Sequence, residues 1–238
     1  MTTKGTLYLI PNFLGDPQTS PLLVPDEQLT IIRGLTEFIV ENEKNARACL
    51  KGLQITTPQN QLTIHVLDKH NPVHGIPTYL KSAESGGNIG LLSDAGVPCV
   101  ADPGAEVVKI AHKKGITIVP FVGPSSILLA VMASGFNGQS FAFHGYLPID
   151  APSRAKKLKQ LEDESRKRKQ TQVFIETPYR NNSMLGDILK HCSPSAMLCV
   201  ACNLTLPDES ITSQSIEQWQ KNTPDLHKKP AVFVLFAG

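Results

Sequence analysis

Short apolar runs rich in β-branched residues alternate with helix-period stretches along nearly the whole chain. Several of these runs, such as NIGLLSD at 88–94 and ITIVPFV at 116–122, are apolar without the polar alternation of a half-exposed strand. Strands that are buried on both faces have this character, and in a strand–helix–strand order they form parallel sheets. The sequence therefore predicts an α/β protein with mostly parallel sheets.

The same pattern gives the expected elements and their boundaries. Strands are expected at 6–12, 37–41, 62–67, 88–94, 116–122, 140–145, 172–177, 196–202 and 231–237. Helices are expected near 26–34, 43–52, 75–86, 104–114, 124–134, 152–168, 178–191 and 214–221. Two sheets of about four or five strands each fit this length better than one large sheet. FVGPSS at 121–126 is the natural boundary, which predicts two α/β domains, 1–121 and 122–238.

The bulk composition favours no large charged or membrane-embedded surface. The formal net charge of the 238 residues is +2, so no global field points to nucleic acid or to a membrane, although a local basic patch is compatible with it. No apolar run reaches the ~18 residues of a membrane span. The apolar stretch at the N-terminus is too short for a signal peptide, so we expect a cytoplasmic location and no membrane partner.

Cysteine and histidine spacing does not predict a metal site. Cys199 and Cys202 form C-x-x-C within an apolar strand, where residues three apart point to opposite faces. We therefore expect both to be buried thiols. His70 and His74 are separated by Pro72, which disfavours the helix that would place them on one metal ion.

Three loops rich in small residues follow predicted strands: SDAGVPCVADPG at 93–104, GPSS at 123–126 and ETPYR at 176–180. In open α/β sheets, ligands bind outside the carboxyl ends of the strands, and small side chains let the backbone approach a ligand closely. The chain contains neither G-x-x-x-x-G-K-[ST] nor G-x-G-x-x-G after its first strand. A phosphate-binding loop and an ordinary dinucleotide fold are therefore disfavoured.

Polar residues in these loops have two interpretations each. Asp94 and Asp102 suit ribose hydroxyls or a cation, or else form a turn and cap the helix that begins at Asp102-Pro103. Ser125 and Ser126 face the ligand or cap the following helix. The basic run RKRK at 166–169 is a solvated helix face or a contact for RNA phosphates.

Several motifs together resemble one known family. They are IPNFLGD (10–16), His70-Asn71, SDAGVP with DPG (93–98 and 102–104), GPSS, GYLP (145–148) and IETPYR (175–180). With these motifs the chain resembles the tetrapyrrole methylase family of S-adenosylmethionine-dependent methyltransferases. Within that family it is most similar to the bacterial branch that methylates the ribose 2′-hydroxyl of a cytidine in small-subunit rRNA.

The resemblance implies two α/β domains with a cofactor cleft between them, a homodimer, S-adenosylmethionine as methyl donor and ribosomal small-subunit RNA as acceptor. No metal is expected, in line with the cysteine and histidine spacing. VENEKNAR (40–47) and KKP (228–230) depart from the motifs of the family at charged positions. A tetrapyrrole-like or other small acceptor, or a non-catalytic cofactor-binding homologue, are the alternatives. The implied cofactor-binding residues are Pro11, Leu14, Asp94, Ala95, Gly96, Val100, Asp102, Ser125, Ser126, Thr177, Leu204 and Ala231.

Methylation of a ribose hydroxyl also needs catalytic groups. This hydroxyl is a poor nucleophile at neutral pH, and a base or a cation that stabilises the alkoxide must assist it. The candidates are Glu41, Arg47 and His70, on loops at the same end of the predicted sheet. Each has a structural alternative, namely a surface ion pair for Glu41 and Arg47 and a turn hydrogen bond for His70.

Overall fold

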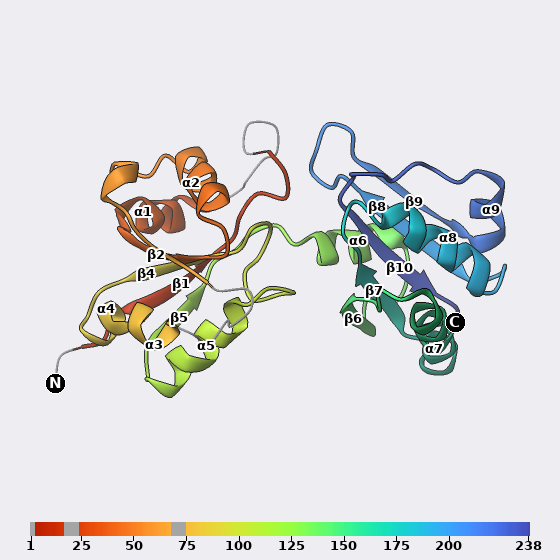
Figure 1. The fold of residues 1–238 in the computed structure, drawn as a ribbon, viewed down its shortest axis with the longest axis horizontal. Coiled ribbons are helices and arrows are strands. Elements are labelled where there is room, and N and C mark those ends of the chain that lie inside the picture. The colour runs from red at the N-terminus through yellow and green to blue at the C-terminus, as the bar shows by residue number, and fades with distance from the viewer. Residues whose placement is uncertain (1–2, 17–23, 68–74) are drawn as a thin grey trace. The chain divides into compact units, whose positions relative to one another are not determined.

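Figure 1 shows the computed structural model of this chain, which describes residues 3–16, 24–67 and 75–238. The chain divides into two compact units, Met1–Ser125 and Ser126–Gly238. This division falls within FVGPSS, a few residues beyond the sequence-based boundary at 121/122. Each unit contains its own five-stranded sheet.

The first unit is built on a parallel sheet with the strand order β3-β2-β4-β1-β5. Its strands are β1 (Thr6–Ile10), β2 (Glu37–Val40), β3 (Thr63–Val66), β4 (Ile89–Leu92) and β5 (Thr117–Pro120). Every residue of β4 is buried, whereas the edge strands β3 and β5 are partly exposed. The continuous apolar run of β4 therefore lies in the middle of the sheet, as its sequence predicts.

Helices cover both faces of this sheet (Figure 1). They are α1 (Asp26–Gly34), α2 (Glu43–Gly52), α3 (Ile76–Tyr79), α4 (Lys81–Glu84) and α5 (Gly104–Lys113), with a short 3-10 helix η1 at Gln59–Gln61. One core cluster contains Ile32 of α1 and Leu50 of α2. A second cluster contains Ile76 of α3 and Val107 of α5, so each face of the sheet has its own apolar core.

The second unit has a mixed sheet with the order β6-β7-β10-β8-β9. Its strands are β6 (Phe141–Tyr146), β7 (Thr171–Ile175), β8 (Met197–Cys202), β9 (Ser210–Ser215) and β10 (Ala231–Phe236). Its helices are α6 (Ser126–Ser134), α7 (Ala151–Arg168), α8 (Asn181–His191) and α9 (Ile216–Lys221). Leu158 of α7, Leu185 of α8 and Trp219 of α9 share one core with the sheet, while α6 contacts β8 and β10.

The α/β class and the parallel first sheet are confirmed, but the second sheet corrects the sequence-based prediction. Only β6 and β7 are parallel there, and the pairs of β10 with β7, β10 with β8 and β8 with β9 are antiparallel. The short connection 203–209 joins β8 to β9, and a connection of that length returns the chain in the opposite direction. β9 was not predicted, because SITSQS is a polar edge strand without an apolar face.

Two smaller differences concern helix boundaries. The helix expected at 75–86 is divided into α3 and α4. α5 begins at Gly104, so Asp102 does not occupy the N-cap position, although its carboxylate still accepts a hydrogen bond from the Gly104 N–H. The remaining predicted elements coincide with observed ones to within a few residues.

Cys199 and Cys202 are both buried in β8 as free thiols, as expected. Cys202 belongs to the same core cluster as Leu198 and Val200, whereas Cys199 does not, which agrees with side chains on opposite faces of the strand. Among the described residues, no helix combines the length and the apolar character of a membrane span.

Candidate active site

The segments that follow β1 and β4 lie side by side at one edge of the first sheet. The two strands are parallel neighbours with Ile10 opposite Leu92, so both end at the same edge. Beyond them, Asn12 and Gly96 form an antiparallel bridge in which backbone N–H and C=O groups exchange hydrogen bonds of 2.8 and 3.2 Å. The loop of small residues at 93–104 is thereby anchored to the chain after β1.

The side chain of Asn12 holds the beginning of this loop. It is 4% exposed, and its carboxamide nitrogen donates to the carbonyl oxygens of Ser93 and Asp94 at 2.9 and 3.1 Å. Its carboxamide oxygen accepts from the Phe13 N–H at 2.8 Å. Ser93 Oγ donates to the Gly96 carbonyl oxygen at 2.9 Å. A buried polar network with its donors and acceptors paired fixes the geometry of the backbone around it.

Further along the loop, the backbone adopts a rarely populated conformation. Gly96, Cys99 and Ala101 have φ values of 68, 70 and 63°, in the left-handed region. Residues other than glycine adopt this region only when the surrounding structure holds them there. The Asp102 carboxylate supplies that hold, because it accepts from the Cys99 N–H at 2.8 Å and from the Gly104 N–H at 2.7 Å.

Burial is the main cause of the pKa shifts of the two titratable side chains Asp102 and Cys99 in this loop. It raises the pKa of the Asp102 carboxyl, although the two backbone hydrogen bonds oppose the rise and Asp94 adds to it. Burial also raises the pKa of the Cys99 thiol to about 12, with the charge of Asp102 as a second cause. This direction disfavours the thiolate form that a nucleophilic cysteine needs.

Replacing Asp102 with asparagine is expected to lower the free energy of unfolding by about 1–3 kcal/mol, because one backbone N–H loses its acceptor. The raised pKa of Asp102 also determines how the stability of the unmodified chain changes with pH. The charged carboxylate disfavours the folded state above the folded pKa, and this penalty disappears as the pH falls through that value. The deficit of Asp102→Asn, measured by urea unfolding, should therefore widen on acidification. If Asp102→Asn and the unmodified chain were equally stable at every pH, the proposed role of Asp102 in holding the loop would be wrong.

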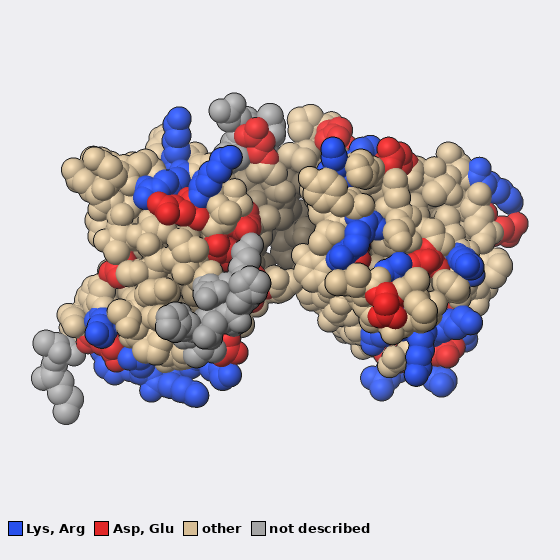
Figure 2. Space-filling model, in the orientation of Figure 1, with Lys and Arg blue, Asp and Glu red and all other residues tan. Residues whose placement is uncertain are grey.

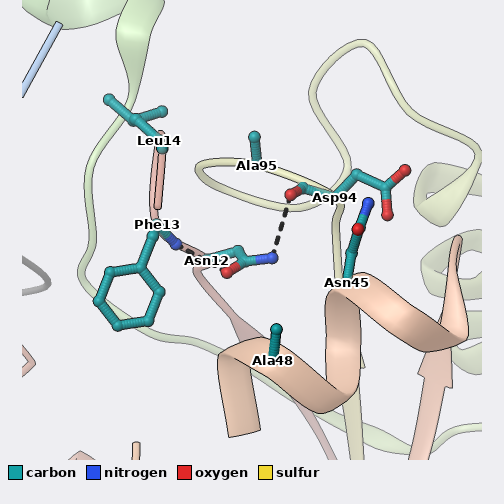
Figure 3. Close-up of a pocket in the computed structure, with 8 residues that line it drawn as sticks. Asn12, Phe13, Leu14, Asn45, Ala48, Asp94 and Ala95 are labelled. Atoms are coloured by element: carbon teal, nitrogen blue, oxygen red, sulfur yellow. Dashed lines mark hydrogen bonds between the residues drawn. The ribbon is translucent and has the colours of Figure 1, made fainter. Parts of the chain in front are cut away.

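A pocket of about 200 Å³ opens beside the contact between Asn12 and Asp94 (Figure 3). Its lining comes from the segments after β1 and β4 and from α2, namely Asn12, Phe13, Leu14, Gly15, Asn45, Ala48, Asp94 and Ala95. In Figure 3 the polar ends of the Asn45 and Asp94 side chains lie on the same side of the pocket. Neither the Asn45 carboxamide nor the Asp94 carboxylate forms a hydrogen bond with another side chain of the described ranges. The pocket therefore has polar groups that suit a ligand.

Glu41 reaches the same edge of the sheet from the end of β2. β2 is the other neighbour of β4, with Val40 opposite Leu92, so Glu41 is the first residue after β2 just as Ser93 is the first residue after β4. A carboxylate oxygen of Glu41 accepts from the Asp94 N–H at 2.9 Å. A carboxylate is thus held one hydrogen bond away from the lining of the pocket.

The other two catalytic candidates are placed differently. Arg47 pairs with Glu43 of its own helix, with 2.7 Å between Nη2 and Oε1, and it also donates to the Gln59 carbonyl oxygen. It is not among the described residues that line the pocket. This geometry favours the surface ion pair, which is the structural alternative for Arg47. His70 lies outside the described residues.

The first unit brings most of its predicted cofactor-binding residues together. Leu14, Asp94 and Ala95 line the pocket, and a Cβ atom on Gly96 would lie 3.1 Å from the Leu14 side chain. Pro11 precedes Asn12 directly and is buried. Three others are not among the residues that line the pocket: Val100, which is exposed, Asp102, which closes the loop, and Ser125, the last residue of this unit.

In the second unit, Thr177, Leu204 and Ala231 lie at one edge of the sheet. β10 is antiparallel to both of its neighbours, so its first residue, Ala231, lies beside the ends of β7 and β8, which Thr177 and Leu204 follow. Ser126 begins α6, which contacts the same strands β8 and β10. This second set of predicted residues is thus also clustered within its own unit.

Asn12 and Asn45 are the polar lining residues that sequence reasoning missed. Asn12 follows an apolar strand by two positions, and a polar residue just after such a strand could have been predicted as a site residue. Asn45 lies in the first turn of α2, where nothing in the sequence separates it from a solvated helix residue. In the described ranges, no group of three or more His, Cys, Asp or Glu residues is arranged to hold a metal ion.

The sequence is similar to proteins of one family over most of its length. Residues 37–220 match the family described as Tetrapyrrole (Corrin/Porphyrin) Methylases. A relative from Xylella fastidiosa is named Ribosomal RNA small subunit methyltransferase I. It is 30% identical over 236 residues, which cover 99% of this chain and 82% of the relative. Relatives with the same name from Escherichia coli O157:H7 and Streptococcus pyogenes serotype M3 are 27% and 29% identical, covering 98% and 99% of this chain and 78% and 77% of theirs.

Solved structures share the fold at lower identity. The crystal structure of the methyltransferase CobJ matches with a TM-score of 0.63 and 16% identity, covering 99% of this chain and 94% of that one. The cobalt precorrin-4 methyltransferase CbiF matches with a TM-score of 0.60 and 14% identity, covering 97% and 94%. At these identities the likeness concerns the arrangement of helices and strands.

Proposed function

Because this chain belongs to the tetrapyrrole (corrin/porphyrin) methylase family, we propose that it transfers a methyl group from S-adenosylmethionine to RNA of the small ribosomal subunit. The proposed acceptor is the ribose 2′-hydroxyl of a cytidine. The observation that carries the proposal is the near full-length similarity to relatives that share one name, Ribosomal RNA small subunit methyltransferase I. The tetrapyrrole-like alternative is not favoured, because its support comes from structures at 14–16% identity.

The loop after β4 supports the assignment of a donor site. Its backbone is held by Asn12 at one end and by Asp102 at the other, and its side chains are small. Pockets for ligands of this size usually measure about 300–1,000 Å³, so the pocket of the first unit would hold only a part of the donor. We assign the remaining contacts to Ser126, Thr177, Leu204 and Ala231 of the second unit.

The charge of the pocket also suits this donor. S-adenosylmethionine supplies a methyl group on a positively charged sulfur, which becomes a neutral thioether after transfer. The Asp94 carboxylate and the carbonyl groups of its loop would attract that positive charge. The chain otherwise acts by alignment, since an in-line displacement needs the acceptor oxygen, the methyl carbon and the sulfur in one line.

The acceptor hydroxyl must lose its proton as the new O–C bond forms and the S–C bond breaks. A base within hydrogen-bond reach accelerates such a step by about 10²–10⁴-fold. We assign this role to Glu41, whose carboxylate is fixed by the Asp94 N–H at the edge of the pocket. Arg47 and His70 remain as weaker candidates for stabilising the alkoxide.

The test is transfer of labelled methyl from S-adenosylmethionine to RNA from cells that lack this gene. Two acceptors are compared, deproteinised small-subunit rRNA and assembled small subunits. We expect label in at least one of them and none in the same acceptor from cells that carry the gene, where the position is already methylated. No label in either acceptor, from a preparation shown to bind the donor, would refute the proposed RNA acceptor.

A further inference from the structure

The turn after β7 and the loop before β10 present an aromatic side chain together with basic ones. Tyr179 is 70% exposed, although it lies next to a well-packed strand end. The ring of His227 stands edge-on to the Tyr179 ring with 5.9 Å between the centroids, and Lys228 Nζ lies 5.9 Å from the centre of the same ring. Lys229 follows and is also exposed. We refer to Tyr179, His227, Lys228 and Lys229 as the Tyr179 corner.

The backbone under the Tyr179 corner is fixed although its side chains are exposed. The Lys228 N–H donates to the Pro178 carbonyl oxygen at 3.0 Å, which joins the loop to the turn. The Leu226 N–H donates to Asn182 Oδ1 at 2.7 Å, and the Leu226 side chain is 3% exposed within the core. Binding at this surface would therefore need little ordering of the backbone, which favours affinity.

The Tyr179 corner also keeps its positive charge. The nearby Arg180 forms an ion pair with the buried Glu176, with 2.6 Å between its Nη2 and the carboxylate, so its charge is balanced within the unit. Lys228 and Lys229 form no ion pair within the described part of the chain. The Asp225 carboxylate accepts from the Asn182 carboxamide at 2.7 Å and from the His227 N–H at 3.0 Å, and these hydrogen bonds lower its pKa, with weaker contributions from the charges of His227 and Lys229. Asp225 is therefore one negative charge beside the Tyr179 corner. Two lysines against the one carboxylate of Asp225 leave a net positive charge beside a tyrosine ring that is 70% exposed and has Lys228 over it.

We propose that the Tyr179 corner holds the RNA substrate, with one nucleobase stacked on Tyr179 and the adjoining phosphates bound by Lys228 and Lys229. Stacking on aromatic side chains combined with cationic contacts is the usual way in which proteins hold single-stranded RNA. The inference rests on the proposed function, since it gives that acceptor a place on the molecule. The location also fits, because Thr177 and Ala231, assigned above to the donor, are each two residues from the corner in sequence.

The basic helix α7 is the competing surface. Figure 2 shows Lys and Arg side chains gathered over this helix, where Lys167 and Arg168 are exposed. Arg166, however, pairs with Glu162 at 2.7 Å, and no aromatic residue occurs in α7. Such a surface can contribute salt-dependent attraction to phosphates, but it cannot stack a base.

The experiment compares variants of the full chain in two assays, binding of small-subunit RNA and methyl transfer to it, each done with deproteinised rRNA and with assembled small subunits. Tyr179→Ala should raise the Kd for RNA by about 5- to 150-fold, because loss of one stacked base costs about 1–3 kcal/mol. Tyr179→Phe keeps the ring and should retain most of the affinity. Lys228→Ala should reduce the slope of log K against log salt by about 0.7–0.9, the value for one phosphate contact. Lys167→Ala is the matched lysine control on α7 and should change the affinity less than Lys228→Ala.

Unfolding and S-adenosylmethionine binding of each variant serve as folding controls, and both should equal those of the unmodified chain. If the unmodified chain methylates RNA and Tyr179→Ala binds RNA equally well, the inference is overturned and the proposed function stands. If the chain binds RNA through Tyr179 without methylating it, the inference stands and the proposed function falls. If the chain neither binds nor methylates RNA, both are overturned.

Discussion

Replacing Glu41 with glutamine is expected to reduce the rate of methyl transfer by about 100-fold or more, as for loss of a general base. Glutamine keeps an oxygen that can accept from the Asp94 N–H, where the Glu41 carboxylate accepts at 2.9 Å, so the loop should stay in place. The Kd for S-adenosylmethionine should therefore change by less than about threefold, in line with a lost interaction well below 1.4 kcal/mol. Single-turnover transfer and calorimetric donor binding measure the two effects separately.

Glu41→Ala is the matched variant, because it removes both the base and the acceptor. It should slow transfer at least as much as Glu41→Gln and should also weaken donor binding, since the Asp94 N–H loses its partner. Transfer by Glu41→Gln at the rate of the unmodified chain would show that Glu41 only positions the loop. The proton would then have to leave through another group.

Replacing Asn12 with alanine is expected to have the largest effect on stability among the site residues. The change removes three hydrogen bonds of a side chain that is 4% exposed, leaving the carbonyls of Ser93 and Asp94 and the Phe13 N–H without this partner. Since each buried polar group left unpaired costs about 1–3 kcal/mol, we expect a loss of roughly 2–5 kcal/mol in the free energy of unfolding. Urea unfolding of Asn12→Ala and of the unmodified chain, followed by a signal from the first unit, measures this loss of stability.

Donor binding by Asn12→Ala should also weaken by at least about tenfold, because the loop that contacts the donor is no longer held in place. A loss of only about 1.4 kcal/mol of binding free energy raises the Kd tenfold. Asn12→Asp is the matched variant with nearly the same shape. It keeps the acceptor for Phe13 N–H but places a carboxylate against the Ser93 and Asp94 carbonyl oxygens, so it should not restore stability. Unchanged unfolding and donor binding in both variants would refute the role of Asn12 as the anchor of the loop.

Much of the first unit could be predicted from the sequence, because its local signals and its tertiary structure agree. The run around Ile89–Leu92 is continuously apolar, and β4 is buried between two parallel neighbours. The ranges 26–34 and 43–52, expected as helices, coincide with α1 and α2. Where apolar period and burial coincide in this way, sequence pattern is a sufficient guide.

The second sheet could be predicted less well, because strand direction depends on how the chain returns. The run AVFVLFA at 231–237 predicts a strand, but it does not predict that β10 lies between β7 and β8 or that it is antiparallel to both. β9 was missed because Ser210, Ser213 and Ser215 make it polar, and it is defined by its hydrogen bonds with β8 rather than by burial. Pairing between distant segments is a tertiary property that overrides local propensity.

The candidate site shows the same division. The loop at 93–104 was recognisable from its small residues and its place after an apolar strand. The bridge between Asn12 and Gly96 and the pairing of Glu41 with the Asp94 N–H join three segments that are remote in sequence. Arg47 shows the limit of a motif. Its ion pair with Glu43 follows from their i, i+4 spacing on α2, but its contact with the Gln59 carbonyl oxygen becomes evident only when α2 and η1 are placed together.

The left-handed backbone at Gly96, Cys99 and Ala101 has a thermodynamic consequence for recognition. The entropy that this loop loses is lost when the chain folds, before any ligand arrives. A ligand that docks against it meets a template whose shape already exists, so its affinity at this edge is determined by contact and solvation rather than by coupled ordering of the loop. Selectivity then follows from rigidity, because a molecule of the wrong shape finds no alternative loop conformation to which it can adapt.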